Sequence, residues 1–213
     1  MMKQTEEARR LPQLKERRLP GECRQSVTAL LKEIYGYDRF RTLEIYDDLF
    51  KSRATCCISQ GQLIENVIRE AEKAWKEEAQ PDNILLTAPT GSGKSLLFQL
   101  PAIYLGREYN LLTIVVSPLK ALIVDQVEGL RDLGYGRVAY ASSDLSPEQK
   151  AEVYRAVREG EVDLFYLSPE LLLSYDIKHF IGGRRIGMVV VDEAHTVTTW
   201  GKEFRVDYWF LGR

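Results

Sequence analysis

The sequence predicts an α/β fold in which helices cover both faces of a parallel β-sheet. From residue 81 onward, short apolar runs rich in β-branched residues alternate with helix-like stretches, a pattern typical of strand–helix repeats. Strands of this kind between helices indicate a parallel sheet, because such a sheet is buried on both faces. The predicted strands are 84–87, 112–116, 137–140, 164–167 and 186–191.

The length and composition fit one globular domain of this class. The chain has 213 residues, of which 45% are apolar and 28% are charged, so there is room for one core and a small extension. No apolar run reaches the roughly 18 residues that cross a bilayer, and the N-terminus lacks the apolar core of a signal peptide. We therefore expect a cytoplasmic protein without membrane partners, associated with the nucleoid if it is bacterial.

Charge and cysteine content argue against a strongly basic nucleic-acid-binding protein and against a protein held together by zinc or disulfides. The 29 Lys and Arg residues against 31 Asp and Glu residues give no overall positive charge, so binding to nucleic acid needs local clusters. Cys23, Cys56 and Cys57 lack metal-ligand spacing and indicate free thiols rather than a zinc site or a disulfide framework.

The first part of the chain has a different pattern. Apolar residues recur at helical spacing in 26–35 and again in 62–78, whereas the first twenty residues are typical of a solvated arm. We therefore expect a helical N-terminal extension at 1–58, followed by the α/β domain at 59–213.

Three predicted strands are each followed by a proline turn that opens a helix. The carboxyl ends of strands are where open α/β sheets bind ligands, and helix N-termini there present unpaired N–H groups that suit phosphates. Backbone donors at Ser117 and Ser168, with Lys120 as a nearby cation, are therefore candidates for contact with DNA phosphates. The alternative is that the serines only cap helices. The turns are Ala88-Pro89, Ser117-Pro118 and Ser168-Pro169.

The first of these turns opens a candidate phosphate loop. Segment 88–95 reads A-P-T-G-S-G-K-S and matches the pattern G-x-x-x-x-G-K-[ST], except that alanine replaces the first glycine. The glycines let successive N–H groups face the β- and γ-phosphates, Lys94 supplies a mobile cation, and Ser95 offers an oxygen to Mg²⁺. A chance glycine-rich turn is the alternative. The predicted ATP-binding residues here are Thr90, Gly91, Ser92, Gly93, Lys94 and Ser95.

Two carboxylates, Asp192 and Glu193, directly follow the apolar run 186–191. An unpaired charge at the end of a buried strand is costly, and a magnesium ion changes that balance because it prefers carboxylate, phosphate and water oxygens. Asp192 is thus the candidate ligand of Mg²⁺, partly through water, and Glu193 is the candidate base that orients the attacking water. The alternative is a solvated strand end.

The loop at 88–95 and the D-E-A-H sequence at 192–195 together resemble the first RecA-like domain of a superfamily 2 helicase, and the surrounding sequence is closest to the RecQ family. This resemblance begins near residue 62 and continues to residue 213. It implies a P-loop NTPase fold, ATP and Mg²⁺ as cofactors, and single-stranded or partly duplex DNA as partner. It also implies catalytic roles for Lys94, Asp192, Glu193 and His195. Segments 91–102, 116–127 and 166–172 resemble motifs I, Ia and Ib of the family.

The segment after the D-E-A-H sequence resembles the aromatic-rich loop by which RecQ enzymes sense single-stranded DNA and couple it to ATP hydrolysis. Trp200, Phe204 and Arg205 keep the stacking and cationic groups that suit unpaired bases. Thr199 and Lys202 stand where the family usually has glutamine and histidine. In the family these two residues belong to the loop that couples DNA contact to catalysis. Core packing is the alternative for the aromatic residues.

The adenine-reading glutamine of the family has no clean counterpart here. Residues 35–41 resemble the sequence that precedes it, but Thr42-Leu43-Glu44 follows where the family has Pro-Gly-Gln. Gln62, which precedes the expected helix, is our candidate. The alternative is an ordinary exposed glutamine at the start of a helix.

The family needs two RecA-like domains, and its motif III strand lies between the strands that precede the phosphate loop and the D-E-A-H sequence. Neither the second domain nor this strand is recognised up to residue 213, so we expect an incomplete domain that does not unwind DNA by itself. The preferred function is the ATP-hydrolysing motor portion of a RecQ-like DNA helicase. The alternatives are a DNA-stimulated ATPase or translocase without unwinding, and a non-catalytic nucleotide-binding switch.

Overall fold

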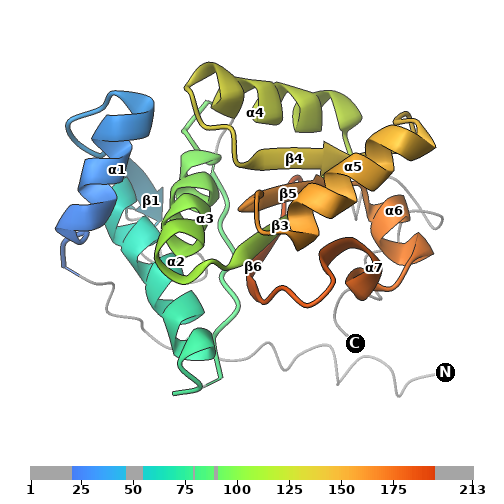
Figure 1. Cartoon of the computed structure of the whole chain (residues 1–213). Helices are drawn as coiled ribbons and strands as arrows, with labels where there is room; N and C mark the ends of the chain where they lie inside the picture. Colours follow the sequence, from blue (N-terminus) through green and yellow to red (C-terminus); the bar gives the residue numbers. More distant parts are fainter. Residues whose placement is uncertain (1–20, 47–54, 79, 89–90, 195–213) are drawn as a thin grey trace, which may run out of the picture.

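The computed structural model describes residues 21–46, 55–78, 80–88 and 91–194 (Figure 1). Helices and strands alternate along most of the chain after residue 95. In chain order the elements are α1 (Gln25–Tyr35), β1 (Thr42–Tyr46), β2 (Thr55–Ser59), α2 (Gln60–Trp75), α3 (Leu96–Tyr109), β3 (Leu112–Val116), α4 (Lys120–Asp132), β4 (Val138–Ala141), α5 (Pro147–Arg158), β5 (Leu164–Leu167), α6 (Pro169–Ser174), α7 (Ile177–Ile181) and β6 (Ile186–Val191).

Strands β3 to β6 form a parallel sheet in the order β4-β5-β3-β6. Three of them, β3, β5 and β6, cover the predicted ranges, and β4 lies one residue later than predicted. The predicted α/β fold class is therefore confirmed. Because β5, β3 and β6 are parallel neighbours, Ser117, Ser168 and Asp192 follow adjacent strand ends at one edge of the sheet.

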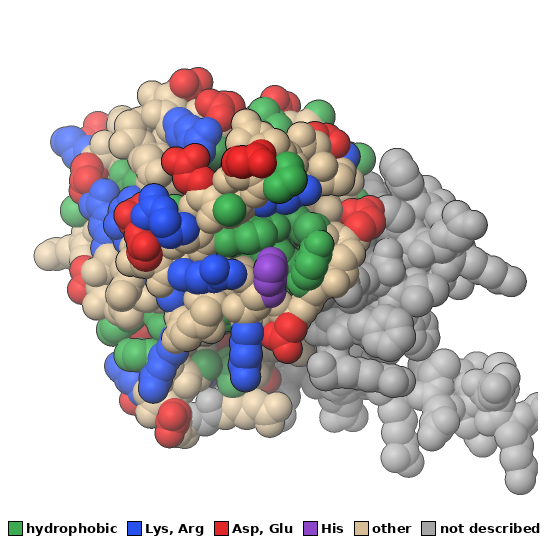
Figure 2. All heavy atoms as spheres, turned by 45° about the vertical axis from the view of Figure 1, so that its right-hand side comes forward, with side chains coloured by type: hydrophobic (Ala, Val, Ile, Leu, Met, Phe, Trp, Pro, Cys, Tyr) green, Lys and Arg blue, Asp and Glu red, His purple; other side chains and the backbone are tan. Residues whose placement is uncertain are grey.

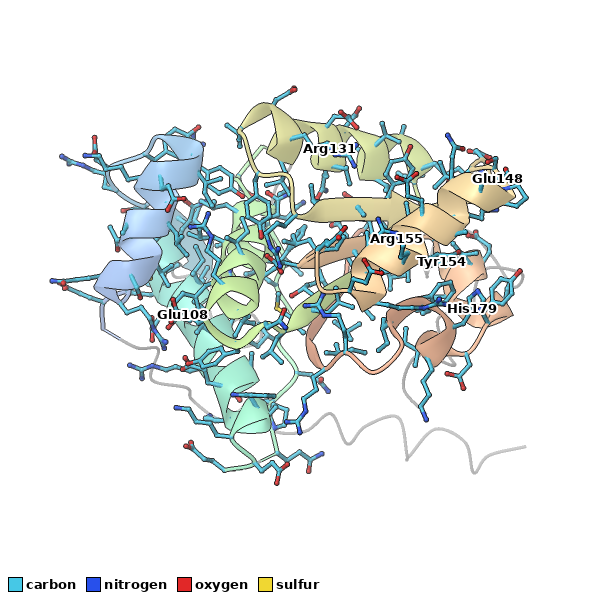
Figure 3. The ribbon with its side chains drawn as sticks, viewed as in Figure 1. Glu108, Arg131, Glu148, Tyr154, Arg155 and His179 are labelled. Atoms are coloured by element: carbon cyan, nitrogen blue, oxygen red, sulfur yellow. The ribbon has the colours of Figure 1, made fainter. Side chains whose placement is uncertain are left out.

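Side chains of the sheet alternate between two hydrophobic layers. On β3, Ile114 and Val116 pack in a cluster with buried residues of α5 and α7, whereas Val115 packs in a second cluster with residues of α1 to α4. Figure 1 shows α1, α2 and α3 on one side of the sheet and α5 and α7 on the other. The rings of Tyr154 on α5 and His179 on α7 have centroids 5.4 Å apart (Figure 3). Helices therefore cover both faces.

The strand predicted at 84–87 is wrong, because residues 80–88 have no regular secondary structure. Leu85 is 86% exposed, although the apolar composition of segment 84–87 favours a buried strand. A strand forms only beside a neighbour that satisfies its backbone groups. Within the described residues β6 pairs with β3 alone, and Val189 on β6 is 55% exposed. No described strand therefore bridges the distance between β6 and the segment before the loop.

The N-terminal region contains a β-hairpin that the helical pattern did not predict. Strands β1 and β2 pair antiparallel, from Thr42 opposite Ser59 to Tyr46 opposite Thr55. Threonine, isoleucine and tyrosine in these strands favour extended structure. The helices predicted on either side of the hairpin are present as α1 and α2 with shifted ends. The domain boundary after residue 58 stays a prediction.

Helix α1 is held against α2 by apolar packing and by Arg24, the residue before its first turn. Val27 and Leu31 are fully buried in the cluster that also contains residues of α2 and α3. The Arg24 guanidinium donates to Glu65 at 2.7 Å and to Glu72 at 2.6 Å, both on α2. The N-terminal helix is therefore part of the packed core.

Helix α3, which follows the phosphate loop, packs too closely on the sheet to accept a side chain at Gly106. A Cβ atom there would lie 2.4 Å from Cγ of Asp163. Asp163 is fully buried and held by the Tyr135 hydroxyl at 2.6 Å and by Nε of Arg137 at 2.7 Å, so it cannot move aside. We expect Gly106→Ala to lower the free energy of unfolding by about 2 kcal/mol, measured by urea denaturation.

The matched control for this substitution is Gly129→Ala on α4. A Cβ atom at Gly129 would have no neighbour within 4 Å. Alanine should therefore leave the stability unchanged or raise it by about 0.5–1 kcal/mol through helix propensity. Equal effects of the two substitutions would contradict the proposed close packing at Gly106.

Candidate functional site

The loop at 88–95 has a backbone that requires glycine at two positions. Gly91 and Gly93 both have a φ of +80°, a left-handed conformation that residues with a side chain rarely adopt. A Cβ atom at Gly93 would also lie 2.7 Å from Nε2 of Gln60, so the contact of Gln60 with the loop would have to change. The backbone conformation of the loop therefore explains why both positions are glycine. Thr90 lies outside the described residues.

The loop offers hydrogen-bond donors to an anion just before α3. Backbone N–H groups of residues 91–94 make no hydrogen bond to another described residue. The buried hydroxyl of Ser92 likewise has no partner in the described part of the chain. Lys94 donates from Nζ to the carbonyl of Ala88 at 2.9 Å. Unpaired donors beside a lysine at the start of a helix fit the phosphate groups of a nucleotide.

Two glutamines at the start of α2 make different contacts. Gln62, our candidate for contact with adenine, accepts a hydrogen bond from the Ser59 N–H at 3.0 Å and closes the capping box of α2. Gln60 is 2% exposed, and its Nε2 donates to the carbonyls of Ser92 and Gly93 at 3.3 Å and 3.5 Å. Gln60 therefore contacts the phosphate loop directly.

The β1–β2 hairpin explains why Gln60 lies far from the sequence that resembles the family. The hairpin returns the chain to Arg41, where the Gln60 N–H donates to the Arg41 carbonyl at 2.9 Å and Oε1 of Gln60 accepts from the Arg41 N–H at 3.2 Å. The Phe40 ring packs on Gly61 so closely that a Cβ atom there would lie 2.6 Å from Cδ2. In space, Gln60 therefore follows Phe40 and Arg41 directly.

The acidic pair lies at the carboxyl end of β6, beside the end of β3. The Asp192 N–H donates to the Val116 carbonyl at 2.9 Å and extends the pairing of the two strands. Glu193 has a φ of +51°, so the chain turns sharply after the strand, and its N–H donates to Oδ1 of Asp192 at 2.9 Å. Both acidic residues are half-buried. His195 lies outside the described residues.

A chain of polar side chains connects Asp192 to α3. Nε2 of Gln126 on α4 donates to Oδ2 of Asp192 at 3.2 Å, and Oε1 of Gln126 accepts from the Tyr166 hydroxyl on β5 at 3.1 Å. Nε2 of Gln99 on α3 donates to the Tyr166 hydroxyl at 3.2 Å, and the Tyr35 hydroxyl on α1 donates to Oε1 of Gln99 at 3.0 Å. Gln99 and Tyr166 are buried, so water does not compete for the hydrogen bond between them.

This chain links the two halves of the predicted site. The Gln99 N–H donates to the Ser95 carbonyl at 2.9 Å, and Nε2 of Gln99 lies 3.4 Å from Oε1 of Gln126. The side chains of Gln99 and Gln126 therefore connect the start of α3, which directly follows Ser95, with Asp192. Neither glutamine was predicted, although a glutamine in an apolar helix signals a buried polar contact.

The oxygen ligands available fit a magnesium ion bound together with a nucleotide. No group of three or more His, Cys, Asp or Glu side chains among the described residues could hold a metal ion alone. Ser95 and Asp192 supply one hydroxyl and one carboxylate. Magnesium is commonly held by one or two protein oxygens, with phosphates and waters completing its shell.

The predicted DNA contacts at this edge of the sheet are less accessible than expected. Ser117 is 2% exposed, its N–H donates to a carbonyl of β5 at 3.1 Å, and α4 begins only at Lys120, so Ser117 does not cap that helix. Ser168 is 4% exposed and caps α6, accepting a hydrogen bond at 3.4 Å. Lys120 is exposed, and its Nζ pairs with Asp144 at 2.8 Å.

The remaining predicted DNA contacts, Trp200, Phe204 and Arg205, lie outside the described residues. Figure 2 shows that Lys and Arg side chains are interspersed with Asp and Glu on the face that carries α5, α6 and α7. Contact with nucleic acid on that face would therefore depend on local groups. None of the described helices combines the length and apolar character needed to span a membrane.

The sequence is similar to those of known helicases. The DEAD/DEAH box helicase family model matches residues 68–210. The chain is 34% identical to ATP-dependent DNA helicase Q-like 5 of Arabidopsis thaliana, in a match that covers 86% of this chain and 17% of that protein. It is 35% identical to ATP-dependent DNA helicase RecQ of Synechocystis sp., in a match that covers 89% of this chain and 33% of that protein. It thus spans about a third or less of the length of these relatives.

A solved structure is also similar. The crystal structure of a hypothetical ATP-dependent RNA helicase from Sulfolobus tokodaii matches with a TM-score of 0.44 and 24% sequence identity. The match covers 69% of this chain and 45% of that chain.

Proposed function

Because the chain belongs to the DEAD/DEAH box helicase family and its RecQ relatives confirm the predicted resemblance, we propose that it is the ATP-hydrolysing motor portion of a DNA helicase. In this function, ATP hydrolysis moves the protein along single-stranded DNA and separates the strands of a duplex. The observation that carries the proposal is the connection of the phosphate loop to Asp192 through Gln99 and Gln126.

The loop would bind the phosphates of ATP. Backbone N–H groups of residues 91–94 would donate to them, and Lys94 would exchange its backbone carbonyl partner for a phosphate oxygen. Thr90 is proposed to contribute to the same loop. We assign contact with the base to Gln60 in place of Gln62, because Gln60 touches the loop whereas Gln62 caps α2.

Ser95 and Asp192 would hold magnesium, Asp192 partly through water, and the bound ion would neutralise charge on the phosphates during hydrolysis. Glu193 would accept a proton from the attacking water and orient it. His195 is proposed, from the family resemblance, to connect the γ-phosphate side of the site to the DNA side.

DNA contact is assigned mainly to Trp200, Phe204 and Arg205, since they combine stacking surfaces with a positive charge. Lys120 would contribute by exchanging Asp144 for a DNA phosphate, which costs little for an exposed ion pair. The side chains of Ser117 and Ser168 are buried, so only the backbone around them remains for such contact.

A DNA-stimulated ATPase that does not separate strands is the second candidate. Thr199 and Lys202 favour it, because they replace residues that couple DNA contact to catalysis in the family that this chain resembles. A non-catalytic nucleotide switch fits less well, since such a protein does not need both Asp192 and Glu193.

Single-stranded DNA is expected to raise the ATP turnover of the full-length protein, because binding at the DNA site is coupled to the ATP site. Phosphate release by the full-length protein, with and without oligo-dT, measures this effect, and a tailed duplex measures strand separation by the same protein. Stimulation with strand separation supports the helicase, and stimulation without it supports the second candidate. If DNA leaves the turnover unchanged, the assignment of Trp200, Phe204 and Arg205 is wrong.

A further inference from the structure

We infer that Gln126 is a positioning residue that fixes the orientation of the Asp192 carboxylate, and that the hydrogen bonds behind Gln126 hold it in place. The inference rests on the proposed function, in which Asp192 contributes to the magnesium site. Gln126 acts through Asp192 and is not itself a ligand.

Both oxygens of Asp192 are bound, each by a different donor. Oδ1 accepts from the Glu193 N–H at 2.9 Å, and Oδ2 accepts from Nε2 of Gln126 at 3.2 Å. Rotation of the carboxylate would break at least one of these bonds. Each oxygen keeps a further lone pair, so the group remains able to bind a cation or its water. Partners of this kind typically set the orientation of a metal ligand.

The residues behind Gln126 determine which end of its amide faces Asp192. Oε1 of Gln126 accepts from the Tyr166 hydroxyl at 3.1 Å and lies 3.4 Å from Nε2 of Gln99. An inverted amide would place Oε1 against the carboxylate and the NH₂ group against the NH₂ group of Gln99. Burial raises the pKa of the Tyr166 hydroxyl far above its ordinary value, so this donor keeps its proton.

The hydrogen bonds that end at Asp192 also run in one direction. Tyr35 donates to Gln99, Gln99 to Tyr166, Tyr166 to Gln126, and Gln126 to Asp192. Groups that donate and accept at the same time polarise one another, and a carboxylate is the strongest acceptor at the end of such a series. The series therefore favours one arrangement of the amide of Gln126 over its inverted form.

The magnesium dependence of nucleotide binding tests this inference on the whole chain. A fluorescent ATP analogue is titrated at increasing Mg²⁺ and in its absence. We expect Gln126→Leu to raise the Mg²⁺ concentration for half-maximal enhancement by about tenfold, while nucleotide affinity without Mg²⁺ stays unchanged. Tyr166→Phe should raise this Mg²⁺ concentration by a smaller factor, because the substitution removes one hydroxyl and keeps the ring.

Two substitutions serve as matched controls. Asn66→Leu replaces a half-buried helical amide on α2, and Tyr140→Phe removes a hydroxyl from the residue opposite Tyr166 on β4. Neither side chain has a hydrogen bond to another described residue, so both variants should keep the wild-type magnesium dependence.

Three outcomes would overturn the inference. An unchanged magnesium dependence in Gln126→Leu and Tyr166→Phe is one, and an equal loss of affinity with and without Mg²⁺, as for a purely structural role, is another. The third comes from Asp192→Asn: if this variant also keeps the wild-type dependence, the magnesium assignment of the proposed function fails first. If Asp192→Asn weakens the dependence while Gln126→Leu does not, the inference alone fails. Should Gln126→Leu not fold, Tyr166→Phe decides.

Discussion

Alanine in place of Lys94 is expected to lower the affinity for ATP by about 10- to 100-fold, because a hydrogen bond to a charged group contributes about 1.5–3 kcal/mol. Lys94 carries the only charged side chain of the 88–95 loop. Its hydrogen-bond acceptor in the structure is the carbonyl of Ala88, so no carboxylate loses its partner in the variant. The fold should therefore remain intact.

Equilibrium dialysis with labelled ATP and magnesium measures this loss, and thermal unfolding checks the fold. Lys178→Ala is the matched control, since Lys178 is an exposed lysine on α7, away from the loop in sequence. It should bind ATP like the wild type. Undiminished binding by the Lys94 variant would remove the loop from the proposed site.

Methionine in place of Arg24 is expected to lower the free energy of unfolding by about 3 kcal/mol, near the lower end for loss of one partner from a buried ion pair. The guanidinium lies between Glu65 and Glu72, and it also packs over the Tyr104 ring at 5.1 Å. The substitution leaves two buried carboxylates without this cation. The Arg24 side chain is 26% exposed, which is why we expect the smaller value.

Arg107→Met is the matched control for this prediction. Arg107 also connects two helices, because it donates from Nη1 and Nη2 to Glu33 at 2.9 Å, but the side chains are 36% and 57% exposed. Exposed pairs contribute about 0–1 kcal/mol. Urea denaturation compares the two variants, and equal losses would show that burial of the Arg24 pair does not matter.

The same ion pair makes stability depend on pH. Burial raises the pKa of Glu65 and Glu72, but hydrogen bonds from Arg24 outweigh it and leave both pKa values below the ordinary 4.5. The resulting stabilisation is complete above that pH and is lost as pH falls through the lowered pKa values of the folded state. Between about pH 6 and about pH 3, the melting temperature should therefore fall more in the wild type than in Arg24→Met.

Apolar, β-branched runs in the sequence were sufficient to predict the strands of the parallel sheet that are flanked on both sides. Strands β3 and β5 are apolar runs flanked on both sides in the sheet, and their ranges agree with the prediction. Ile84 and Leu85 have a similar composition, but no described strand lies beside them. Composition predicts the ability to form a strand, whereas pairing decides whether the strand forms.

The candidate site was predicted where its chemistry is local in sequence. The glycines at 91 and 93 and the acids at 192 and 193 follow from short motifs. The structure places Gln60, two positions before the predicted Gln62, beside the loop, and a hairpin separates Gln60 from Arg41 in the sequence. Gln99 and Gln126 lie within segments that resemble motifs I and Ia, but their contacts could not be predicted, since their partners lie 27 to 67 residues away along the chain.

The residues just before and just after the hairpin lie side by side, since Arg41 and Gln60 hydrogen-bond across its base. The length of the intervening segment is therefore uncoupled from the position of Gln60. Doubling a flexible connection costs only about 0.6 kcal/mol in closure entropy, so evolution can insert, extend or exchange sequence there with little penalty. A protein engineer can use the same position to graft a reporter module near the 88–95 loop.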